Sequence, residues 1–490
     1  MQQTLFVLLL QLQHLSCALF PQPEHIAAAR AEHPLHGGMV ALQQRFRHIG
    51  LNGARKAAAL HPPCAAAALQ DALAQRKRHR QPLMPDIRGA VHILAQCKGG
   101  APAFQHQRGK IGKAFFQQSP ALGQRAGIFF VIVDGTQHRT VAAVQWGGRY
   151  RIVDFMLSNM VNSGIYRVGI LMKDKYQSLI DHVGNAKDWD LSRKNSGVTI
   201  LPPYSYSKKA SPLVTGEYRG KIDALAGAVD FLQKNKADYV VVADGDIVGN
   251  IPLDDVIDRH IKSGADLTMV CTKKQKDSPF TTYVELNRRK EAVDIRVGDS
   301  NDGKCKHVSL GVYVMNRQYL IHMLSDCVTH NCIHFEREFL SRALIDGTVA
   351  GYLFNEYAIK IEDTADYFRS NMDMLDKDVR DEVFKRTRPI LTRIKDEAPT
   401  YYGDEAEVDD CLIADGCRIE GHVENCVLFR DVEVEKGAVL KDCIIMEGGR
   451  ILSEASLKHV VTDRNVVVRN GRTMMGDENY PITIAKNSTI

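Results

Sequence analysis

From about residue 127 onward, strand-like apolar runs alternate with amphipathic stretches that are typical of helices. A short apolar run at 166–172 is followed by an amphipathic stretch, and a second amphipathic stretch at 222–233 leads into the long apolar run 238–247. Continuous apolar strands that are each separated by one helix are typical of a parallel sheet covered by helices on both faces. The pattern therefore predicts an α/β domain with a mostly parallel sheet over residues 127–384.

A second pattern follows a basic, proline-punctuated linker at residues 385–403. Over residues 404–490, aliphatic positions recur at roughly every five to six residues, with Gly, Asp, Glu and Asn between them. This spacing is too short for helices and too regular for loops, so it predicts a parallel β-helix of hexapeptide repeats. Because its coils stack on one another, such a domain commonly builds oligomers. The recurring aliphatic positions are Ile413, Ile419, Val427, Val434, Leu440, Ile445, Ile451 and Leu457.

The first quarter of the chain has a different composition. Residues 1–126 hold 15 Lys and Arg against 4 Asp and Glu, a balance of +11 in a chain whose net charge is +5. They are rich in Ala, Gln, His and Arg and show no sustained helical or strand period. We interpret this segment as a disordered extension or an error in where the gene starts, with a nucleic-acid arm or a transit peptide as the alternative.

Cysteine usage and hydropathy predict the compartment. The 11 cysteines are scattered without paired spacing, which favours reduced thiols over disulfides. No apolar stretch reaches the length of about 18 residues that a membrane span needs. The apolar stretch near the start lacks a basic flank and is interrupted by Gln11, Gln13 and His14, unlike a signal peptide. We therefore expect a cytoplasmic protein without nucleic-acid or membrane partners.

The longest apolar run ends in the acidic sequence Ala-Asp-Gly-Asp at residues 243–246. Ligands of open α/β sheets bind at the carboxyl ends of the strands, and carboxylates are the groups that Mg²⁺ prefers. Asp244 and Asp246 are thus candidate metal ligands. The alternative, which the sequence leaves open, is that they form only a solvated strand end.

A second candidate site is the pair Gly147–Gly148, which stands beside Arg149 and Arg151 directly ahead of an amphipathic run. Glycines let a backbone approach a ligand closely, and arginines beside them favour an anion. The alternative is that these residues serve only the packing of a loop and a helix.

Several motifs in order then carry a family resemblance. "GGRYRIVDFMLSNMVNSGI" (147–165), "YRGKIDAL" (218–225), the strand ending "ADGD" and the hexapeptide tail together resemble bacterial ADP-glucose pyrophosphorylase, or glucose-1-phosphate adenylyltransferase. The likeness runs from Thr136 to Ile490 and is greatest to the D-type, regulatory subunit of glycogen synthesis. It implies a Rossmann-like nucleotidyltransferase domain followed by a left-handed parallel β-helix.

The resemblance also implies roles for single residues. It places Gly147, Gly148, Tyr218, Gly220 and Asp223 in the binding of substrate. It keeps Asp246 as the candidate Mg²⁺ ligand and catalytic residue, whereas the position of the second metal carboxylate is occupied by His334, and neutral imidazole is a poor Mg²⁺ ligand.

The chain departs from the family pattern at several positions that contact phosphate or sugar. A family lysine is replaced by Val141, which cannot neutralise phosphate charge. Lys221 and Ile222 replace a Thr-Ala pair, and no Glu-Lys-Pro segment occurs between residues 281 and 308. Because in-line attack on a phosphate needs positive groups around it, these losses together argue against turnover.

We therefore expect a regulatory subunit that has little or no activity in joining ATP and glucose 1-phosphate into ADP-glucose and pyrophosphate. Its implied partner is the catalytic adenylyltransferase subunit, in a hetero-oligomer of tetrameric size. Mg²⁺ is expected only if activity or nucleotide binding remains, and the candidate ligands are ATP, ADP-glucose and glucose 1-phosphate. The alternatives are an autonomous sugar-phosphate nucleotidyltransferase, in which Lys221 compensates for lost lysines, and a nucleotide or sugar-phosphate sensor.

Overall fold

The computed structural model describes residues 126–130 (backbone only), 140–172, 175–194, 196–201, 218–273, 278–300 and 303–490. The predicted N-terminal extension lies outside the described residues except for Ala126, which begins the first strand. Residues 131–139 lie outside them as well. Within the described part of the chain, no helix has the length and apolar character that crossing a membrane requires.

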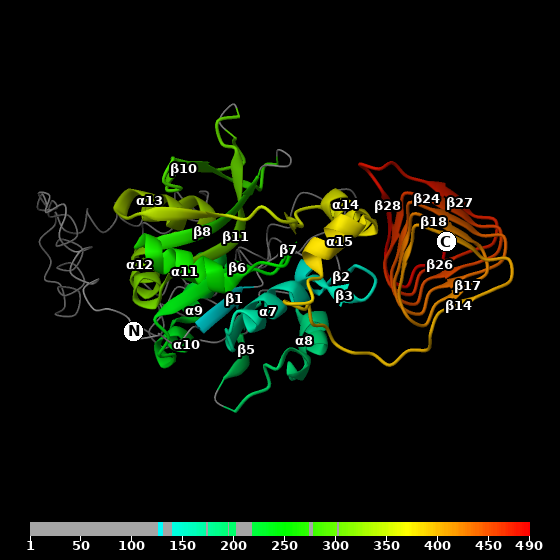
Figure 1. Cartoon of the computed structure of the whole chain (residues 1–490), viewed down its shortest axis with the longest axis horizontal. Coiled ribbons are helices and arrows are strands. Elements are labelled where there is room, and N and C mark those ends of the chain that lie inside the picture. Colours follow the sequence, from blue (N-terminus) through cyan, green and yellow to red (C-terminus); the bar gives the residue numbers. More distant parts are fainter. Residues whose placement is uncertain are drawn as a thin grey trace, which may run out of the picture. The chain divides into compact units, whose positions relative to one another are not determined.

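A nine-stranded sheet forms the centre of the first domain (Figure 1). Its strands are β1 (Ala126–Phe130), β4 (Arg167–Leu171), β5 (Gly197–Leu201), β6 (Tyr239–Asp244), β8 (Leu267–Lys273), β9 (Thr282–Leu286), β10 (Ala292–Val297), β11 (His307–Asn316) and β12 (Val349–Leu353). The main path runs β10-β9-β11-β6-β1-β4-β5, and β8 joins it beside β11. Strands β6, β1, β4 and β5 are mutually parallel, whereas β11 is antiparallel to β6 and to β8. The predicted α/β fold is confirmed.

Strand β6 shows why this sheet has helices on both faces. Val241 and Ala243 belong to one buried cluster, which includes α7, α8 and α11, while Val240 and Val242 belong to another, which includes α9, α12 and α13. Successive side chains of a strand point to opposite faces, so the continuous apolar run from Val240 to Ala243 requires a core on each side. The helices are α7 (Ile152–Asn162), α8 (Gln177–Val183), α9 (Lys221–Gly227), α10 (Val229–Lys234), α11 (Leu253–Ser263), α12 (Arg317–Thr329), α13 (Leu340–Asp346), α14 (Thr364–Met372) and α15 (Lys377–Val383).

Three shorter features shape the edges of this domain. The single amphipathic helix expected at 222–233 is divided into α9 and α10 at Ala228. A π-helical turn, η4, precedes α13. A short hairpin, β2–β3, and a two-stranded antiparallel sheet of β7 and β13 complete the domain. The bounds of these elements and of the 3-10 turns are β2 (Gln145–Trp146), β3 (Tyr150–Arg151), β7 (Ile247–Gly249), β13 (Ala358–Lys360), η2 (Val141–Ala143), η3 (Lys187–Trp189), η4 (Phe335–Phe339) and η5 (Asp373–Leu375).

The C-terminal domain consists of three parallel five-stranded sheets. The first holds β14 (Tyr401–Tyr402), β17 (Arg418–Ile419), β20 (Glu433–Val434), β23 (Arg450–Ile451) and β26 (Val467–Val468). The second holds β15 (Glu407–Asp409), β18 (His422–Glu424), β21 (Val439–Lys441), β24 (Ser456–Lys458) and β27 (Thr473–Met475). The third holds β16 (Leu412–Ile413), β19 (Val427–Leu428), β22 (Ile444–Ile445), β25 (Val460–Thr462) and β28 (Ile482–Ile484). This arrangement fits the predicted left-handed β-helix.

The hexapeptide pattern produces this domain because it places aliphatic residues of successive coils directly above one another. Ile419 pairs with Val434, Val434 with Ile451, and Ile451 with Val468 on successive coils. Of the eight aliphatic positions singled out in the sequence, all are buried except Ile413, which is half-buried. The interior is therefore a column of aliphatic side chains that each coil extends by one layer.

A further buried cluster joins the two domains. It combines Trp146 and Phe155 of the first domain with Val427, Phe429 and Ile444 of the β-helix. The rings of Trp146 and Phe155 meet edge to face with their centroids 5.0 Å apart. At the edge of this cluster, the Gln145 side-chain amide donates a hydrogen bond of 2.8 Å to Glu447. The two domains thus share part of their apolar core.

Acid sensitivity of the first domain is expected to depend on His260. This side chain is 3% exposed, its Nδ1 lies 2.9 Å from Thr268 Oγ1, and burial lowers its pKa from 6.5 to about 4. Between those pH values the unfolded chain binds a proton that the folded chain does not, so stability falls as the pH falls, by up to about 3 kcal/mol. We expect His260→Gln to lose less thermal stability than the wild type between about pH 7 and about pH 4.5. The control is His322→Gln on α12, an exposed histidine; an equal acid-induced loss in all three proteins would contradict the expectation.

Two neighbouring residues of β21 test the stacking of the β-helix. Leu440 is fully buried, whereas Val439 is 40% exposed. We expect Leu440→Ala to lower the free energy of unfolding by about 2–5 kcal/mol, because it leaves a cavity in the aliphatic column. Val439→Ala should change it by less than about 0.5 kcal/mol. Thermal and urea unfolding measure both; similar losses in the two variants would be inconsistent with a column packed through Leu440.

Candidate functional site

Asp244 occupies the carboxyl end of β6 and is 2% exposed. The neighbouring strand β11 makes room for this carboxylate by an irregularity between Ser309 and Tyr313. Gly311 lies there with a φ of +75°, and a Cβ on it would stand 2.3 Å from Asp244 Oδ2. A side chain at position 311 is excluded both by the left-handed backbone and by this approach.

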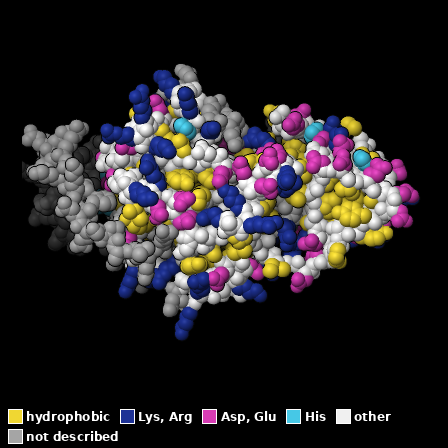
Figure 2. Space-filling view, viewed as in Figure 1, with side chains coloured by type: hydrophobic (Ala, Val, Ile, Leu, Met, Phe, Trp, Pro, Cys, Tyr) yellow, Lys and Arg dark blue, Asp and Glu magenta, His cyan; other side chains and the backbone are white. Residues whose placement is uncertain are grey.

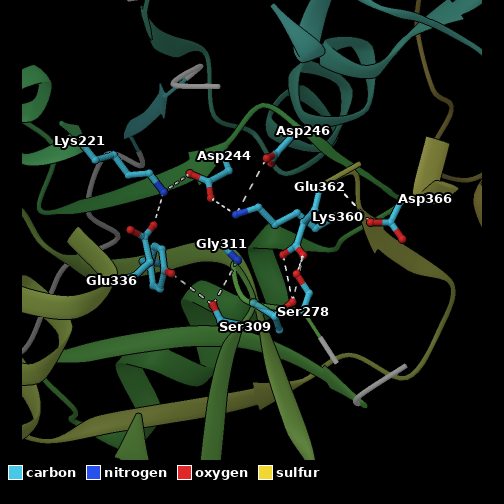
Figure 3. Close-up of polar contacts among 12 residues, drawn as sticks. Lys221, Asp244, Asp246, Ser278, Ser309, Gly311, Glu336, Lys360, Glu362 and Asp366 are labelled. Carbon is cyan, nitrogen blue, oxygen red and sulfur yellow. Dashed lines mark hydrogen bonds and ion pairs between the residues drawn. The ribbon is translucent and has the colours of Figure 1, made fainter. Parts of the chain in front are cut away.

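Two lysines enclose the Asp244 carboxylate (Figure 3). Lys221 Nζ lies 2.8 Å from Asp244 Oδ1, and Lys360 Nζ donates a hydrogen bond of 2.8 Å to Asp244 Oδ2. Lys221 is the first residue of α9, and Lys360 is the last residue of β13. Strand β13 pairs with β7 directly after the acidic sequence, and this pairing brings Lys360 back to the end of β6. Each oxygen of Asp244 therefore faces an ammonium group.

Lys221 also forms an ion pair with Glu336, which lies in the π-helical turn η4. π-Turns are rare and occur often at functional sites. His334, expected at the position of the second metal carboxylate, is exposed, and its backbone N–H donates to Glu338. The structure thus brings Glu336, and not His334, to the ammonium group that faces Asp244.

Burial and charge act in opposite directions on this cluster. Burial alone would raise the pKa of Asp244, but the ammonium groups of Lys221 and Lys360 outweigh it and hold that pKa below its ordinary value. Burial alone would lower the pKa of Lys221 and of Lys360, but Asp244 and the other carboxylates raise both above the ordinary value. All three groups are consequently charged at neutral pH.

Asp246 is in a different state, although it lies only two residues away. Its side chain is 10% exposed, and its Oδ2 is 4.0 Å from Lys360 Nζ. Its other oxygen, Oδ1, is buried and has no hydrogen-bond partner among the residues that the structure describes. Burial, opposed by Lys360 and reinforced by Asp244, raises the pKa of Asp246 to about 6.

As it is arranged, the cluster does not fit a Mg²⁺ ion. A hard divalent cation needs several carboxylate or other oxygens directed at one point, and both oxygens of Asp244 are directed at ammonium groups. Among the described residues, no three His, Cys, Asp or Glu side chains are placed so that they could hold a metal. The two ammonium groups occupy the positions beside Asp244 that a bound cation would need.

Beside this cluster lies a small cavity in which Lys360 forms part of the wall. Glu362 closes one side of the cavity because it accepts hydrogen bonds from Ser278 Oγ at 2.6 Å and Thr281 Oγ1 at 3.1 Å. Arg369 donates a hydrogen bond of 2.7 Å to Asp366, so its charge is also compensated locally. The lining residues are Thr272, Thr281, Val308, Ser309, Leu310, Ala358, Ile359, Lys360, Glu362, Asp366 and Arg369.

The glycine pair lies in the turn between β2 and β3. Gly147 and Gly148 have φ values of +59° and +79°, which explains why both are glycine. Gly147 N–H donates to Asn371, and a Cβ on Gly148 would be 3.7 Å from the Leu428 carbonyl oxygen of the β-helix. Arg151 donates to the Ser178 carbonyl at 2.7 Å. These contacts hold the turn against the rest of the protein. The predicted role of Gly147 and Gly148 in substrate binding stays a prediction.

The remaining predicted substrate residues surround the start of α9. Tyr218 is 4% exposed, and burial raises its pKa. Gly220 presses on the loop before η4, since a Cβ there would be 2.5 Å from Ile333. Asp223 accepts a hydrogen bond of 2.7 Å from Arg219 Nε. Together they fix the helix that carries Lys221, and substrate contact by them also stays a prediction.

Sequence reasoning found Asp244 and Asp246 but missed Lys360, Glu336 and Gly311. Lys360 is 116 residues from Asp244, and Glu336 is 115 residues from Lys221. The only local signal was a lysine inside the otherwise apolar run Ala-Ile-Lys-Ile at 358–361. Nothing in the sequence around Glu336 indicated a role at the site, apart from the neighbouring aromatic residue Phe335.

Comparisons with known proteins agree with both domains. A nucleotidyl transferase family model matches residues 136–373, and a GlmU-like C-terminal hexapeptide model matches residues 398–480. The chain is 32% identical over 355 residues to the glycogen biosynthesis protein GlgD of Bacillus subtilis (strain 168), which covers 72% of this chain and 91% of that relative. It is 35% identical over 310 residues to GlgD of Geobacillus stearothermophilus, with 62% and 77% covered. It is 31% identical over 329 residues to the glucose-1-phosphate adenylyltransferase of Thermosipho melanesiensis, with 65% and 75% covered.

Replacing the central carboxylate tests the charge balance. We expect Asp244→Asn to lower the free energy of unfolding by about 3 kcal/mol, because it leaves two mostly buried ammonium groups without their shared partner. Asp230→Asn on α10, where the side chain is exposed, should change it by less than about 0.5 kcal/mol. Denaturant unfolding measures the difference. Equal stability of the two variants would show that Glu336 and Asp246 alone satisfy the lysines.

Proposed function

Because the chain belongs to the family of GlgD proteins and glucose-1-phosphate adenylyltransferases, we propose that it is a regulatory subunit of glucose-1-phosphate adenylyltransferase in glycogen biosynthesis. In this role it has little or no activity of its own in forming ADP-glucose from ATP and glucose 1-phosphate. It works in the cytoplasm, in a hetero-oligomer of tetrameric size with the catalytic adenylyltransferase subunit.

The observation that carries this proposal is the double lysine contact of Asp244. Transfer of an adenylyl group needs positive charge directed at the phosphates and a cation held by carboxylates. In this chain the nearest ammonium groups are directed at carboxylates of the protein itself. Because the ammonium groups of Lys221 and Lys360 are paired with carboxylates of the protein, they do not neutralise the charge of a triphosphate. This pairing supports the proposal that the site has lost activity.

The surface of the β-helix supports association with another subunit. Figure 2 shows hydrophobic side chains gathered on this end of the molecule with Asp and Glu around them. Large hydrophobic residues of this domain are exposed, which suits a protein interface. They are Tyr401, Tyr402, Val408, Val439, Met475 and Tyr480.

The test is ADP-glucose synthesis by purified components. We expect no measurable rate from this chain alone and a changed rate or effector dependence when it is mixed with the catalytic subunit of the same cell. Met475→Asp should weaken that change, because it places a charge on a β-helix residue that is 67% exposed. The matched control is Ile345→Asp on α13, where the side chain is 81% exposed and lies in the other domain.

A substantial rate from the chain alone, abolished by Asp246→Asn, would overturn the proposal in favour of an autonomous nucleotidyltransferase. A catalytic subunit indifferent to this chain would also overturn it. Thermal shift of the chain alone with ATP, ADP-glucose or glucose 1-phosphate would then identify a sensor, if one of these ligands stabilises it.

A further inference from the structure

Three cysteines occupy the same corner of successive coils of the β-helix. Cys411, Cys426 and Cys443 each stand directly before a strand of the third sheet, namely β16, β19 and β22, and these strands pair in register. In each case the preceding residue has a positive φ, and these residues are Asp410, Asn425 and Asp442. The three thiols therefore stack along the domain, and we call them the cysteine ladder.

Neighbouring members of the cysteine ladder are in direct contact. The Cys426 N–H donates a hydrogen bond to the Cys411 Sγ atom at 3.4 Å, and the Cys443 N–H donates one to the Cys426 Sγ atom at 3.3 Å. Paired strands lie about 4.7–4.9 Å apart. The Cα atoms of a disulfide usually lie about 4.4–6.8 Å apart. The separation of two adjacent coils thus falls within the range that a disulfide spans.

Cys411 differs from the other two cysteines because it ends the ladder. Strand β16 is the edge strand of its sheet, and Cys411 is half-buried, whereas Cys426 and Cys443 are fully buried. On the same terminal coil Val408 is 38% exposed, although Val423, with which it pairs on the next coil, is buried. The end of the ladder is therefore accessible to a small solute, and the other two thiols are covered.

The first two thiols also differ in acidity. A hydrogen bond from the Cys426 thiol holds the pKa of Cys411 below its ordinary value, although burial and the charge of Asp410 oppose this effect. Burial raises the pKa of Cys426 well above its ordinary value. The thiolate is the form of cysteine that reacts with oxidants, and redox-sensitive cysteines are commonly acidic, accessible and adjacent to a second thiol. Cys411 and Cys426 together have these properties.

We propose that Cys411 is a peroxide-reactive thiol and that Cys426 converts its oxidised form into a disulfide between the first two coils of the β-helix. The reactant is a hydroperoxide small enough to reach the terminal coil, such as hydrogen peroxide. The reduced chain is the resting form, and a dithiol restores it. This inference goes beyond the regulatory role, since it concerns one chain and needs no partner subunit.

The oxidation takes two steps. In the first, the Cys411 thiolate attacks one peroxide oxygen, an S–O bond forms, the O–O bond breaks, and the departing hydroxide takes up a proton and leaves as water. In the second, the Cys426 sulfur attacks the Cys411 sulfur, the S–O bond breaks, and the Cys426 proton leaves with the hydroxide as a second water. The two thiols thus lose two electrons and two protons, and the peroxide is reduced to two waters.

The experiment treats the reduced full chain with limiting hydrogen peroxide, blocks the remaining thiols with N-ethylmaleimide and maps tryptic peptides by mass spectrometry. We expect the peptide of residues 396–418 to be joined to that of residues 419–430, with the loss of two hydrogen masses. Dithiothreitol should separate them again. Cys411 and Cys417 share the first peptide, so fragmentation must place the bridge at Cys411.

Three alanine variants assign the roles of the thiols. Cys426→Ala should leave Cys411 as a sulfenic acid that dimedone traps, and Cys411→Ala should abolish both the bridge and the dimedone adduct in these peptides. The matched control is Cys443→Ala, which removes the thiol on the other side of Cys426 and should form the bridge as the wild type does. Circular dichroism compares the folding of the variants with that of the wild type.

A second measurement uses the wild type alone and therefore depends on the folding of no variant. Iodoacetamide should alkylate Cys411 at least about tenfold faster than Cys271, which is fully buried and whose pKa burial raises to about 12. The proposal fails if these two rates are equal, or if peroxide leaves Cys411 and Cys426 unlinked. Neither result depends on ADP-glucose synthesis, so failure here and failure of the regulatory role are distinguishable.

Discussion

Charge compensation of a carboxylate buried at the end of a central strand is the constraint on which the rest of the first domain depends. Asp244 is 2% exposed, and an ionised group at such a position is stable only beside opposite charge. The chain meets this requirement with ammonium groups from the start of α9 and the end of β13. This requirement explains the glycines at positions 220 and 311. Gly220 lets the segment around Ile333 approach the start of α9, and Gly311 leaves room for the Asp244 carboxylate.

A self-compensated cluster suits a protein that has kept a fold and given up its chemistry. Catalytic sites hold charges that the folded protein leaves partly unsatisfied, and this lowers stability in exchange for activity. Here the ammonium groups of Lys221 and Lys360 lie against the carboxylates of Asp244 and Glu336. Burial, opposed by Lys360, raises the pKa of Asp246 to about 6. This arrangement agrees with the proposed regulatory role, in which the chain has little or no activity of its own.

Local patterns were sufficient for the fold and insufficient for the site. The apolar runs and the hexapeptide spacing predicted the α/β sheet and the β-helix, because strand and coil periodicities are properties of neighbouring residues. The strand-end position of Asp244 and Asp246 followed from the same reasoning. Lys360 and Glu336 could not be found this way, since their partners are 116 and 115 residues distant. His334 occupied the expected place in the sequence, but the π-turn that begins at Phe335 directs Glu336 to the cluster instead.

The apolar cluster shared by the two domains has a consequence for how such a chain can be divided. Trp146 and Phe155 are fully buried, and they belong to the same cluster as Val427, Phe429 and Ile444. A fragment that ended in the linker would expose part of that cluster to water and would tend to aggregate. The β-helix therefore cannot be removed without exposing apolar residues of the first domain. Separation or exchange of the domains at the linker would therefore require other residues to cover this apolar surface.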